Sequence, residues 1–281
     1  MSEYARPEVL VETNEVADNL DAANTRIVEV DYDPTTAYNQ EHVPGAVLFD
    51  WKTDLNDPVA RDIVTSEQFN ALLSKAGISK GTNVVLYGDF TNWFAAFAFW
   101  IFKYYGHDSL QLMNGGRKKW IEEDRPSSTD TPSYQSTNYI AEQPDESIRA
   151  YQDHVQSKLG SPNFGLVDVR SPKEFDGEVL APPEYPTEHA QRGGHIPGAA
   201  NIPWSQAIEE DGTFKPTDEL KRLYEPRGIT SEKEIIAYCR IGERSSHSWF
   251  VLKYLLGYSD VRNYDGSWTE WGNMMRNPIE K

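Results

Sequence analysis

The chain has 281 residues, which is more than one small domain ordinarily holds, so two domains are expected. Its net charge of −17, from 27 basic and 44 acidic residues, argues against nucleic acid or an anionic membrane as a partner. One cysteine excludes an internal disulfide and a cysteine-cluster metal site, and the six histidines form no zinc-like pair, so no metal and no cofactor is predicted.

No apolar run is long enough to cross a bilayer, and the first residues lack the basic and apolar segments of a secretory signal. A cytoplasmic protein is therefore expected.

In chain order, short apolar β-favouring runs alternate with helical stretches, which is typical of βα units around a parallel sheet. Residues 125–145 interrupt this pattern with a polar stretch rich in Pro, Ser and Thr, as in a linker. The predicted domains are therefore residues 1–124 and 146–281. The second contains an insertion, residues 176–194, with three prolines and no clear period, which we interpret as a surface loop.

The two halves resemble each other. Residues 83–88 parallel residues 234–239, and residues 112–120 parallel residues 263–271, with an offset of 151 in both cases (239 − 88 and 271 − 120). A period of about half the chain indicates two copies of one domain. The predicted fold class is α/β, with two internally duplicated domains, each a mostly parallel central sheet flanked by helices. Further matches pair residues 27–31 with 166–170 and residues 42–46 with 195–199.

The only cysteine lies between a predicted strand and a predicted helix. Residues 235–238 are continuously apolar, and apolar residues recur at helical spacing from Trp249 to Leu256, before Gly257. Cys239 would then lie where backbone N–H groups and the helix dipole favour an anion, with Arg240 and Arg244 beside it. This setting predicts a thiol of lowered pKa that acts as a nucleophile, against the alternative of a buried small hydrophobe.

The offset also predicts which copy is active. It aligns Gly88 with Cys239, Asp89 with Arg240 and Trp93 with Arg244. The first copy therefore lacks the thiol and both arginines, and only the second can perform nucleophilic thiol chemistry. We expect the first copy to be an inactive packing partner that lines a cleft through Tyr32, Trp93 and Phe94.

Two further features have structural interpretations. Asp168 and Arg170, at a strand end, could form a buried ion pair that braces the loop or could contact substrate; bracing is favoured for Asp168. His195 is interpreted as a hydrogen-bonding turn residue rather than a general base, because His42 occupies the same motif in the copy without cysteine.

Together these motifs resemble the tandem-domain rhodaneses, which are thiosulfate or 3-mercaptopyruvate sulfurtransferases, over nearly the whole chain. The resemblance implies that Cys239 attacks the outer sulfur of a small anionic donor and keeps it as a persulfide. A thiophilic acceptor, cyanide or a thiol, including a thiol on a protein, then takes that sulfur. It also implies that the loop amides cradle the persulfide and that the guanidinium groups hold the donor. The donor-binding residues would be Arg240, Ile241, Gly242, Glu243 and Arg244.

The resemblance leaves the donor open. Ile241 and Glu174 stand where the best-known thiosulfate-specific pattern has a lysine and an arginine. The mercaptopyruvate pattern has small uncharged residues directly after the cysteine, unlike Arg240. Thiosulfate is favoured, with 3-mercaptopyruvate as the alternative.

Two other classes of protein are less favoured. Cysteine-dependent phosphatases and arsenate reductases have five residues between cysteine and arginine, whereas this chain has four between Cys239 and Arg244. A non-catalytic rhodanese-like binding module would not need the retained Cys239 and its two arginines.

Overall fold

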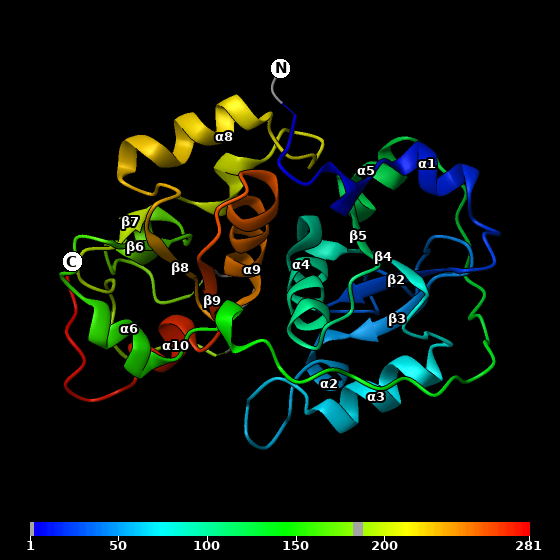
Figure 1. Ribbon diagram of the computed structural model, residues 1–281, viewed down its shortest axis with the longest axis horizontal. Helices are drawn as coiled ribbons and strands as arrows, with labels where there is room; N and C mark the ends of the chain where they lie inside the picture. Colours follow the sequence, from blue (N-terminus) through cyan, green and yellow to red (C-terminus); the bar gives the residue numbers. More distant parts are fainter. Residues whose placement is uncertain (1–2, 182–187) are drawn as a thin grey trace. The chain divides into compact units, whose positions relative to one another are not determined.

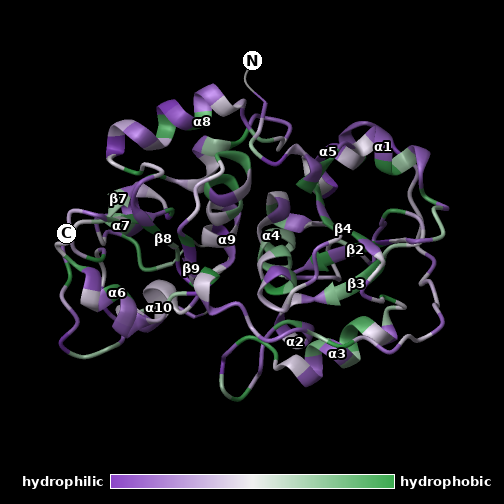
Figure 2. Ribbon diagram, viewed as in Figure 1, coloured by the Kyte–Doolittle hydropathy of each residue, from purple (hydrophilic) through white to green (hydrophobic). Residues whose placement is uncertain are grey.

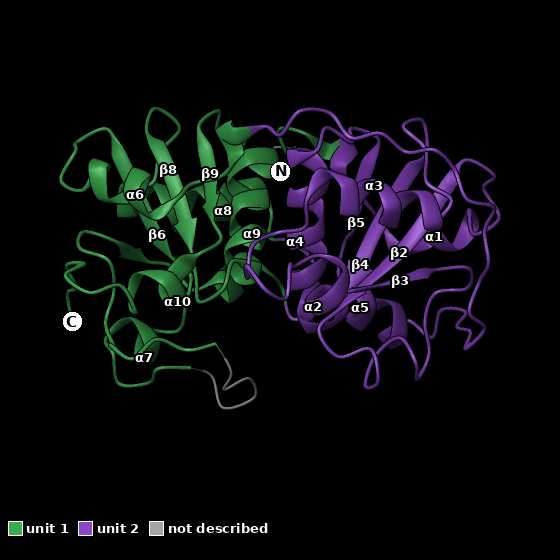
Figure 3. Ribbon diagram, turned by 90° about the horizontal axis from the view of Figure 1, so that it is seen from below, with its two compact units in different colours: residues 1–7, 146–209, 215–281 green, residues 8–145, 210–214 purple. Residues whose placement is uncertain are grey.

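The computed structural model describes residues 3–181 and 188–281 and divides into two compact units (Figure 3). The amino-terminal unit, purple in Figure 3, comprises residues 8–145 and 210–214. The carboxyl-terminal unit, green, comprises the described parts of residues 1–7, 146–209 and 215–281. Each unit is an α/β sheet structure, which confirms the predicted fold class (Figure 1).

The amino-terminal unit is built on a parallel sheet of order β1-β5-β4-β2-β3. Its two long strands, β2 and β4, are buried except at their first residues, as the central strands of parallel sheets are. The strands are β1 (Leu10–Val11), β2 (Thr25–Asp31), β3 (Val47–Asp50), β4 (Asn83–Gly88) and β5 (Leu110–Met113), and the α-helices are α1 (Thr13–Asp18), α2 (Trp51–Asp54), α3 (Ser66–Lys75), α4 (Asp89–Tyr104) and α5 (Gly116–Glu122).

The carboxyl-terminal unit has a parallel sheet of order β7-β6-β8-β9. Because β6 and β8 are paired so that Asp168 lies opposite Tyr238, the loops that follow these two strands begin side by side. The strands are β6 (Phe164–Asp168), β7 (Ala200–Asn201), β8 (Glu234–Tyr238) and β9 (Val261–Tyr264); the α-helices are α6 (Gln152–Lys158), α7 (Pro172–Phe175), α8 (Thr217–Tyr224), α9 (Glu243–Phe250), continued by a π-helical turn (Val251–Leu255), and α10 (Ser267–Trp271).

The duplication extends to individual hydrogen bonds. The Tyr87 hydroxyl accepts from the Val43 amide at 2.9 Å, and the Tyr238 hydroxyl accepts from the Ile196 amide at 3.1 Å. Tyr87 and Tyr238 are 151 residues apart, the offset found in the sequence. Residues 42–46 and 195–199 share the sequence His-Xaa-Pro-Gly-Ala. Each tyrosine therefore connects its buried strand to the residue that follows the histidine of this motif.

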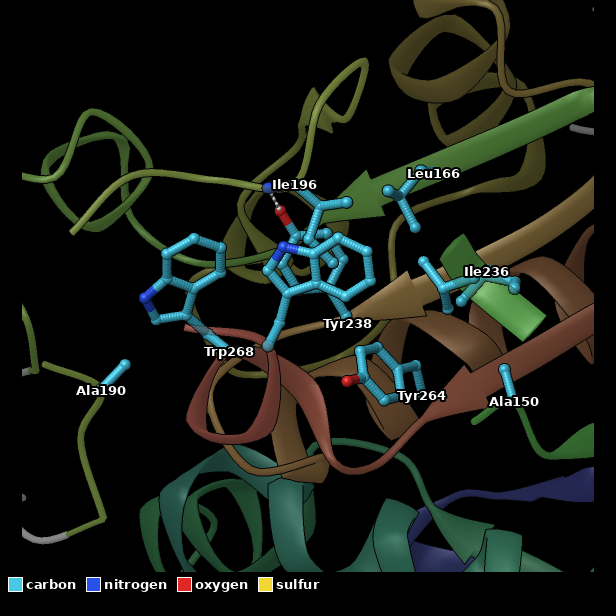
Figure 4. Packing of buried hydrophobic residues seen from close by; sticks show 10 residues of the cluster. Ala150, Leu166, Ala190, Ile196, Ile236, Tyr238, Tyr264 and Trp268 are labelled. Carbon is cyan, nitrogen blue, oxygen red and sulfur yellow. Dashed lines mark hydrogen bonds between the residues drawn. The ribbon is translucent and has the colours of Figure 1, made fainter. Parts of the chain in front are cut away.

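The core of the carboxyl-terminal unit forms around this tyrosine (Figure 4). Tyr238, Tyr264 and Trp268 are fully buried and pack with Leu166 and Ile236 from the central strands. Figure 4 shows the Tyr238 hydroxyl directed at the Ile196 amide. Burial of such aromatic side chains contributes about 2–3 kcal/mol each, so this cluster fixes the strand end from which Cys239 emerges.

Polar residues cover the outside. Helix α8 is mostly purple in Figure 2 with short green bands, and its buried residues are Thr217, Leu220 and Tyr224. This is the pattern of a helix with one apolar face against a sheet. In the described ranges, no helix combines the length and apolar character that crossing a membrane requires.

Two segments cross between the units. Residues 210–214 belong to the amino-terminal unit, where Asp211 accepts from Lys119 at 2.6 Å. Residues 3–7 belong to the carboxyl-terminal unit, where the Ala5 amide donates to the Leu255 carbonyl. The segment predicted as a linker lies along the amino-terminal unit. Its Tyr134 hydroxyl donates to the Gly45 carbonyl at 2.7 Å.

The 176–194 insertion is described only in part, since residues 182–187 lie outside the described ranges. Its last residues are held in place: the Arg192 guanidinium donates to carbonyls that follow α10, including Gly272 at 2.8 Å and Asn277 at 3.1 Å. The insertion ends at Gly194, whose carbonyl accepts from Arg170 at 2.8 Å. It is therefore anchored to the strand end that adjoins Cys239.

Candidate active site

Cys239 lies between β8 and α9, as predicted, with its side chain fully buried. Residues of α10 anchor the start of its loop. The Cys239 amide donates to the Ser267 hydroxyl at 3.1 Å, and its carbonyl accepts from the Trp268 amide at 3.2 Å. These two hydrogen bonds hold the backbone from which the thiol projects.

The loop directs an amide at the sulfur. The Gly242 N–H donates to Cys239 Sγ at 3.2 Å. Gly242 has φ +99°, in the left-handed region that favours glycine, and caps the N-terminus of α9. An amide and a helix N-terminus at one sulfur stabilise negative charge that develops there.

A buried polar network holds Gly242 in this orientation. Its carbonyl accepts from the hydroxyls of Ser245 at 3.1 Å and Ser246 at 2.7 Å and from the Asn263 side-chain amide at 3.3 Å. Sequence analysis missed these three residues. The repeat carries the signal for them, because the offset of 151 places Phe94, Ala95 and Leu112 at the same positions in the copy without cysteine.

A Gly242→Ala substitution should therefore impair the site more than it impairs the fold. A Cβ at this position would lie 2.9 Å from Asp265 Cα in addition to the backbone strain. Gly160→Ala is the matched control, since Gly160 has φ +79° and an open surrounding. We expect both variants to lose about 1–2 kcal/mol from backbone strain. Only Gly242→Ala should also slow the reaction of Cys239, measured by alkylation rate, and equal rates in both variants would contradict the role of the Gly242 amide.

Arg244 is part of a buried ion pair. Its two terminal nitrogens donate to the two carboxylate oxygens of Glu174 in α7, at 2.9 and 3.0 Å. Burial alone would raise the pKa of Glu174, but Arg244 lowers it to about 2. Glu174 stands where the thiosulfate-specific pattern has an arginine, and in this protein it is the partner of Arg244. Sequence analysis did not foresee this pair, because the two residues are 70 positions apart.

Asp168 and Arg170 form the buried ion pair that the sequence favoured. The Arg170 guanidinium donates to Asp168 Oδ2 at 2.6 Å and to the Gly194 carbonyl. His195 likewise occupies a turn, where its Nδ1 lies 3.0 Å from the Phe175 carbonyl and its ring stacks on Phe175. The Asp168–Arg170 pair lies at the end of β6, next to the strand that leads to Cys239, whereas His195 contacts α7.

The predicted direction of the Cys239 pKa shift is wrong. Burial raises the pKa of the thiol, Glu243 raises it further, and Arg244 lowers it. The main physical reason is burial of the thiol, and the second is the Glu243 carboxylate, whose Oε2 accepts from Cys239 Sγ at 3.1 Å. Arg240 and Ile241, between these two residues, are also buried.

The equivalent loop of the amino-terminal unit is acidic. Asp89 stands in the place of Arg240, and its carboxylate accepts from the Tyr32 amide at 3.3 Å. Burial and the neighbouring Asp31 raise the pKa of Asp89 to about 8. Phe90, Thr91 and Asn92 all have positive φ, so the loop follows a different path from the one around Cys239. This loop lacks the thiol and both arginines of the loop around Cys239, so it offers an anion no positive side chain at the aligned positions.

The predicted cleft-lining residues form an aromatic cluster within this unit. Tyr32 stacks on Phe94 at a centroid distance of 5.4 Å, and Trp93 stacks on Phe90 at 5.4 Å. Phe94 is fully buried. A role for Tyr32, Trp93 and Phe94 toward the substrate stays a prediction.

A buried carboxyl near this loop should make stability depend on pH. Burial and Asp31 raise the pKa of Glu29 to about 9. A raised folded-state pKa means that the folded form retains a proton that the unfolded chain releases, so stability should fall as pH rises from about 5 to 9. At about 1.4 kcal/mol per pKa unit, a shift from 4.5 to about 9 corresponds to about 6 kcal/mol, so Glu29→Gln should remove a fall of this order. Thermal melting across that pH range measures it, and an unchanged slope would contradict the assignment.

Within residues 3–181 and 188–281, no group of three or more His, Cys, Asp or Glu is placed to hold a metal ion. The site consists of the buried Cys239 thiol with the Gly242 amide and the Glu243 carboxylate in contact with it and the Arg244 guanidinium next to Glu243.

Comparison with known proteins places this site in a family. The rhodanese-like domain family matches residues 12–123 and 151–274. The chain therefore belongs to the rhodanese family, in two copies. It is 56% identical over 281 residues to the sulfur carrier protein TtuD of Thermus thermophilus, covering 99% of this chain and 98% of that protein. It is 55% identical over 276 residues to a Mycolicibacterium smegmatis protein named "Putative thiosulfate sulfurtransferase", covering 98% and 99%.

Solved structures show the same fold. The anaerobic ergothioneine biosynthesis enzyme from Chlorobium limicola, in complex with trimethyl histidine, matches with a TM-score of 0.88 and 27% identity, over 100% of this chain and 72% of that one. The family, fold and relatives together define a sulfurtransferase of the rhodanese type.

Proposed function

We propose that the protein transfers a sulfane sulfur from thiosulfate to a thiophilic acceptor through a persulfide on Cys239. The observation that carries the proposal is the Gly242 N–H directed at Cys239 Sγ at 3.2 Å, at the N-terminus of α9. The relative from Mycolicibacterium smegmatis named for thiosulfate sulfurtransferase supports the donor. A solved EanB variant, 27% identical, in which ergothioneine is covalently linked with a persulfide cysteine, supports the intermediate.

The reaction has two steps. The Cys239 sulfur attacks the outer sulfur of thiosulfate, the S–S bond of the donor breaks, and sulfite leaves with the bonding electron pair. Cyanide or a thiol then attacks the terminal sulfur of the persulfide, and Cys239 leaves as the thiolate. The loop amides stabilise the sulfur anion in both steps, and Arg240, next to Cys239, holds the oxyanion of the donor. Arg244 is paired with Glu174 and Glu243, so it also positions these two carboxylates in addition to any contact with the donor.

Thiocyanate formation from cyanide tests the proposal. We expect a larger kcat/KM with thiosulfate than with 3-mercaptopyruvate, and stoichiometric release of sulfite. Turnover with 3-mercaptopyruvate alone would overturn the donor. Hydrolysis of a phosphate ester without thiocyanate formation would overturn the reaction class.

A second candidate is a sulfur carrier that passes the sulfur to a protein thiol. The relative of 56% identity named as a sulfur carrier protein favours it. If it is correct, persulfidated protein freed of thiosulfate should lose one sulfur to a thiol protein much faster than to glutathione at equal concentration.

A further inference from the structure

One carboxylate joins the nucleophile to the buried arginine. Glu243 is fully buried; its Oε2 accepts from Cys239 Sγ at 3.1 Å, and its Oε1 lies 3.3 Å from Arg244 Nε. Arg244 is held in turn by Glu174. The contacts therefore run without a gap from Cys239 through Glu243 and Arg244 to Glu174. Arg244, which Glu174 holds, fixes the position of the Glu243 carboxylate that accepts from the thiol.

The contact between Cys239 and Glu243 constrains where a proton can be. A sulfur anion and an ionised carboxylate at this distance, away from water, repel each other strongly. The pair is therefore stable with one proton between its members, as in two carboxylates that share a site. When Cys239 becomes an anionic persulfide, the same proton belongs on Glu243.

We propose that Glu243 accepts the proton of Cys239 as the sulfur is transferred and returns it when the sulfur leaves. The inference rests on the proposed function. In the first step the thiol, the Glu243 carboxylate and thiosulfate become an anionic persulfide, a neutral Glu243 carboxyl and sulfite. In the second step cyanide takes the terminal sulfur as thiocyanate, and the proton goes back from Glu243 to the Cys239 thiolate. Neither step needs an oxidant, a reductant or a proton from solvent.

The surrounding charges fit this role. Arg244 faces Glu243 from α9, Glu174 faces Arg244 from α7, and Arg240 follows Cys239 in the loop. On the side of β9, Asp265 packs against Gly242 and is paired with Arg149 at 2.7 Å. Arg244 keeps the Glu243 carboxylate in place, and Glu174 prevents Arg244 from contributing a full positive charge to the sulfur.

The inactive copy gives an independent comparison. The offset of 151 places Asn92 at the position of Glu243, and the Asn92 side chain reaches the residue equivalent to the cysteine, accepting from the Gly88 amide at 3.1 Å. In that copy a neutral side-chain amide contacts the backbone of the residue that replaces the cysteine, whereas Glu243 contacts the cysteine sulfur itself. The acid is present only in the copy that has a proton to exchange.

The test compares wild type with Glu243→Gln. Because Cys239 is the only cysteine, the ultraviolet thiolate absorbance that remains after subtraction of the Cys239→Ser titration, which removes the contribution of the 15 tyrosines, reports its ionisation. We expect Glu243→Gln to ionise at lower pH, since the carboxylate that repels the thiolate is gone. Despite this, single-turnover persulfide formation at about pH 7 should be about 100-fold slower, because the proton acceptor is lost. Glu243→Asp, which keeps a carboxylate, should lie between the two.

The opposite result is equally clear. If persulfide formation in Glu243→Gln rises together with the thiolate fraction, Glu243 only suppresses ionisation, and the proposal is wrong. The wild-type protein provides a measurement that needs no variant: persulfide formation should be slower in D₂O, and equal rates in both solvents would also overturn it. Should wild type gain no sulfur from thiosulfate, the proposed donor fails, and the same comparison is made with 3-mercaptopyruvate.

Discussion

Cys239→Ser should form no persulfide and should lower thiocyanate formation by at least about 1,000-fold, because the only nucleophilic sulfur of the site is removed. The fold should be retained. Serine has nearly the same shape, and its hydroxyl can donate to Glu243 as the thiol does. The backbone of residue 239 keeps its hydrogen bonds, because its amide donates to the Ser267 hydroxyl and its carbonyl accepts from the Trp268 amide.

Sulfite release and thiocyanate formation measure this effect, and thermal melting and circular dichroism serve as the control for folding. A folded Cys239→Ser protein with a rate near that of wild type would contradict any mechanism through a persulfide on this residue.

Arg244→Ala should be among the most destabilising single changes in the carboxyl-terminal unit. The side chains of Arg244 and Glu174 are 4% and 2% exposed, so loss of the arginine leaves a buried carboxylate without its partner. Breaking a buried pair in this way costs about 3–5 kcal/mol. The variant should also lose sulfur transfer, because Glu243 then lacks the guanidinium that positions it.

Two comparisons separate this pair from an ordinary ion pair. Lys80→Ala, which breaks an exposed pair with Glu142, should cost less than about 1 kcal/mol. Replacing both Arg244 and Glu174 by apolar residues should recover much of the stability, though not the activity. Destabilisation by Arg244→Ala no larger than that by Lys80→Ala would contradict the buried pair.

The same pair predicts an acid transition. The folded-state pKa of Glu174, about 2, is lower than its ordinary value of 4.5, so its stabilisation is complete above about pH 5 and is lost as pH falls towards 2. Glu174→Gln should therefore be less stable than wild type near neutral pH. The difference should shrink as the medium becomes more acidic.

The repeat made most of the fold predictable. Two segments with the same offset of 151 indicated two copies of one α/β domain, and the apolar run before Cys239 indicated a buried strand that leads into a helix N-terminus. The structure confirms both. Residues 210–214 pack with the amino-terminal unit through Asp211 and Lys119, a tertiary contact that no local pattern reveals.

The electrostatics of the site were harder to predict. The effect of a helix N-terminus on a thiol can be read from sequence, whereas burial and the Glu243 contact depend on side-chain packing. The pairing of Arg244 with Glu174 joins residues far apart in the chain, so sequence showed only that Glu174 was unusual. A role for Ser245, Ser246 and Asn263 could have been predicted from the sequence, because these polar residues replace apolar ones of the first copy at all three positions.

Intact-mass spectrometry after incubation with thiosulfate tests the central claim most directly. The account predicts that wild-type protein gains the mass of one sulfur atom, that peptide mapping places it on Cys239, and that cyanide removes it. Cys239→Ser should gain nothing under the same conditions. A wild-type protein that releases sulfite while Cys239 remains unmodified, or a sulfur that is still acquired by Cys239→Ser, would contradict it.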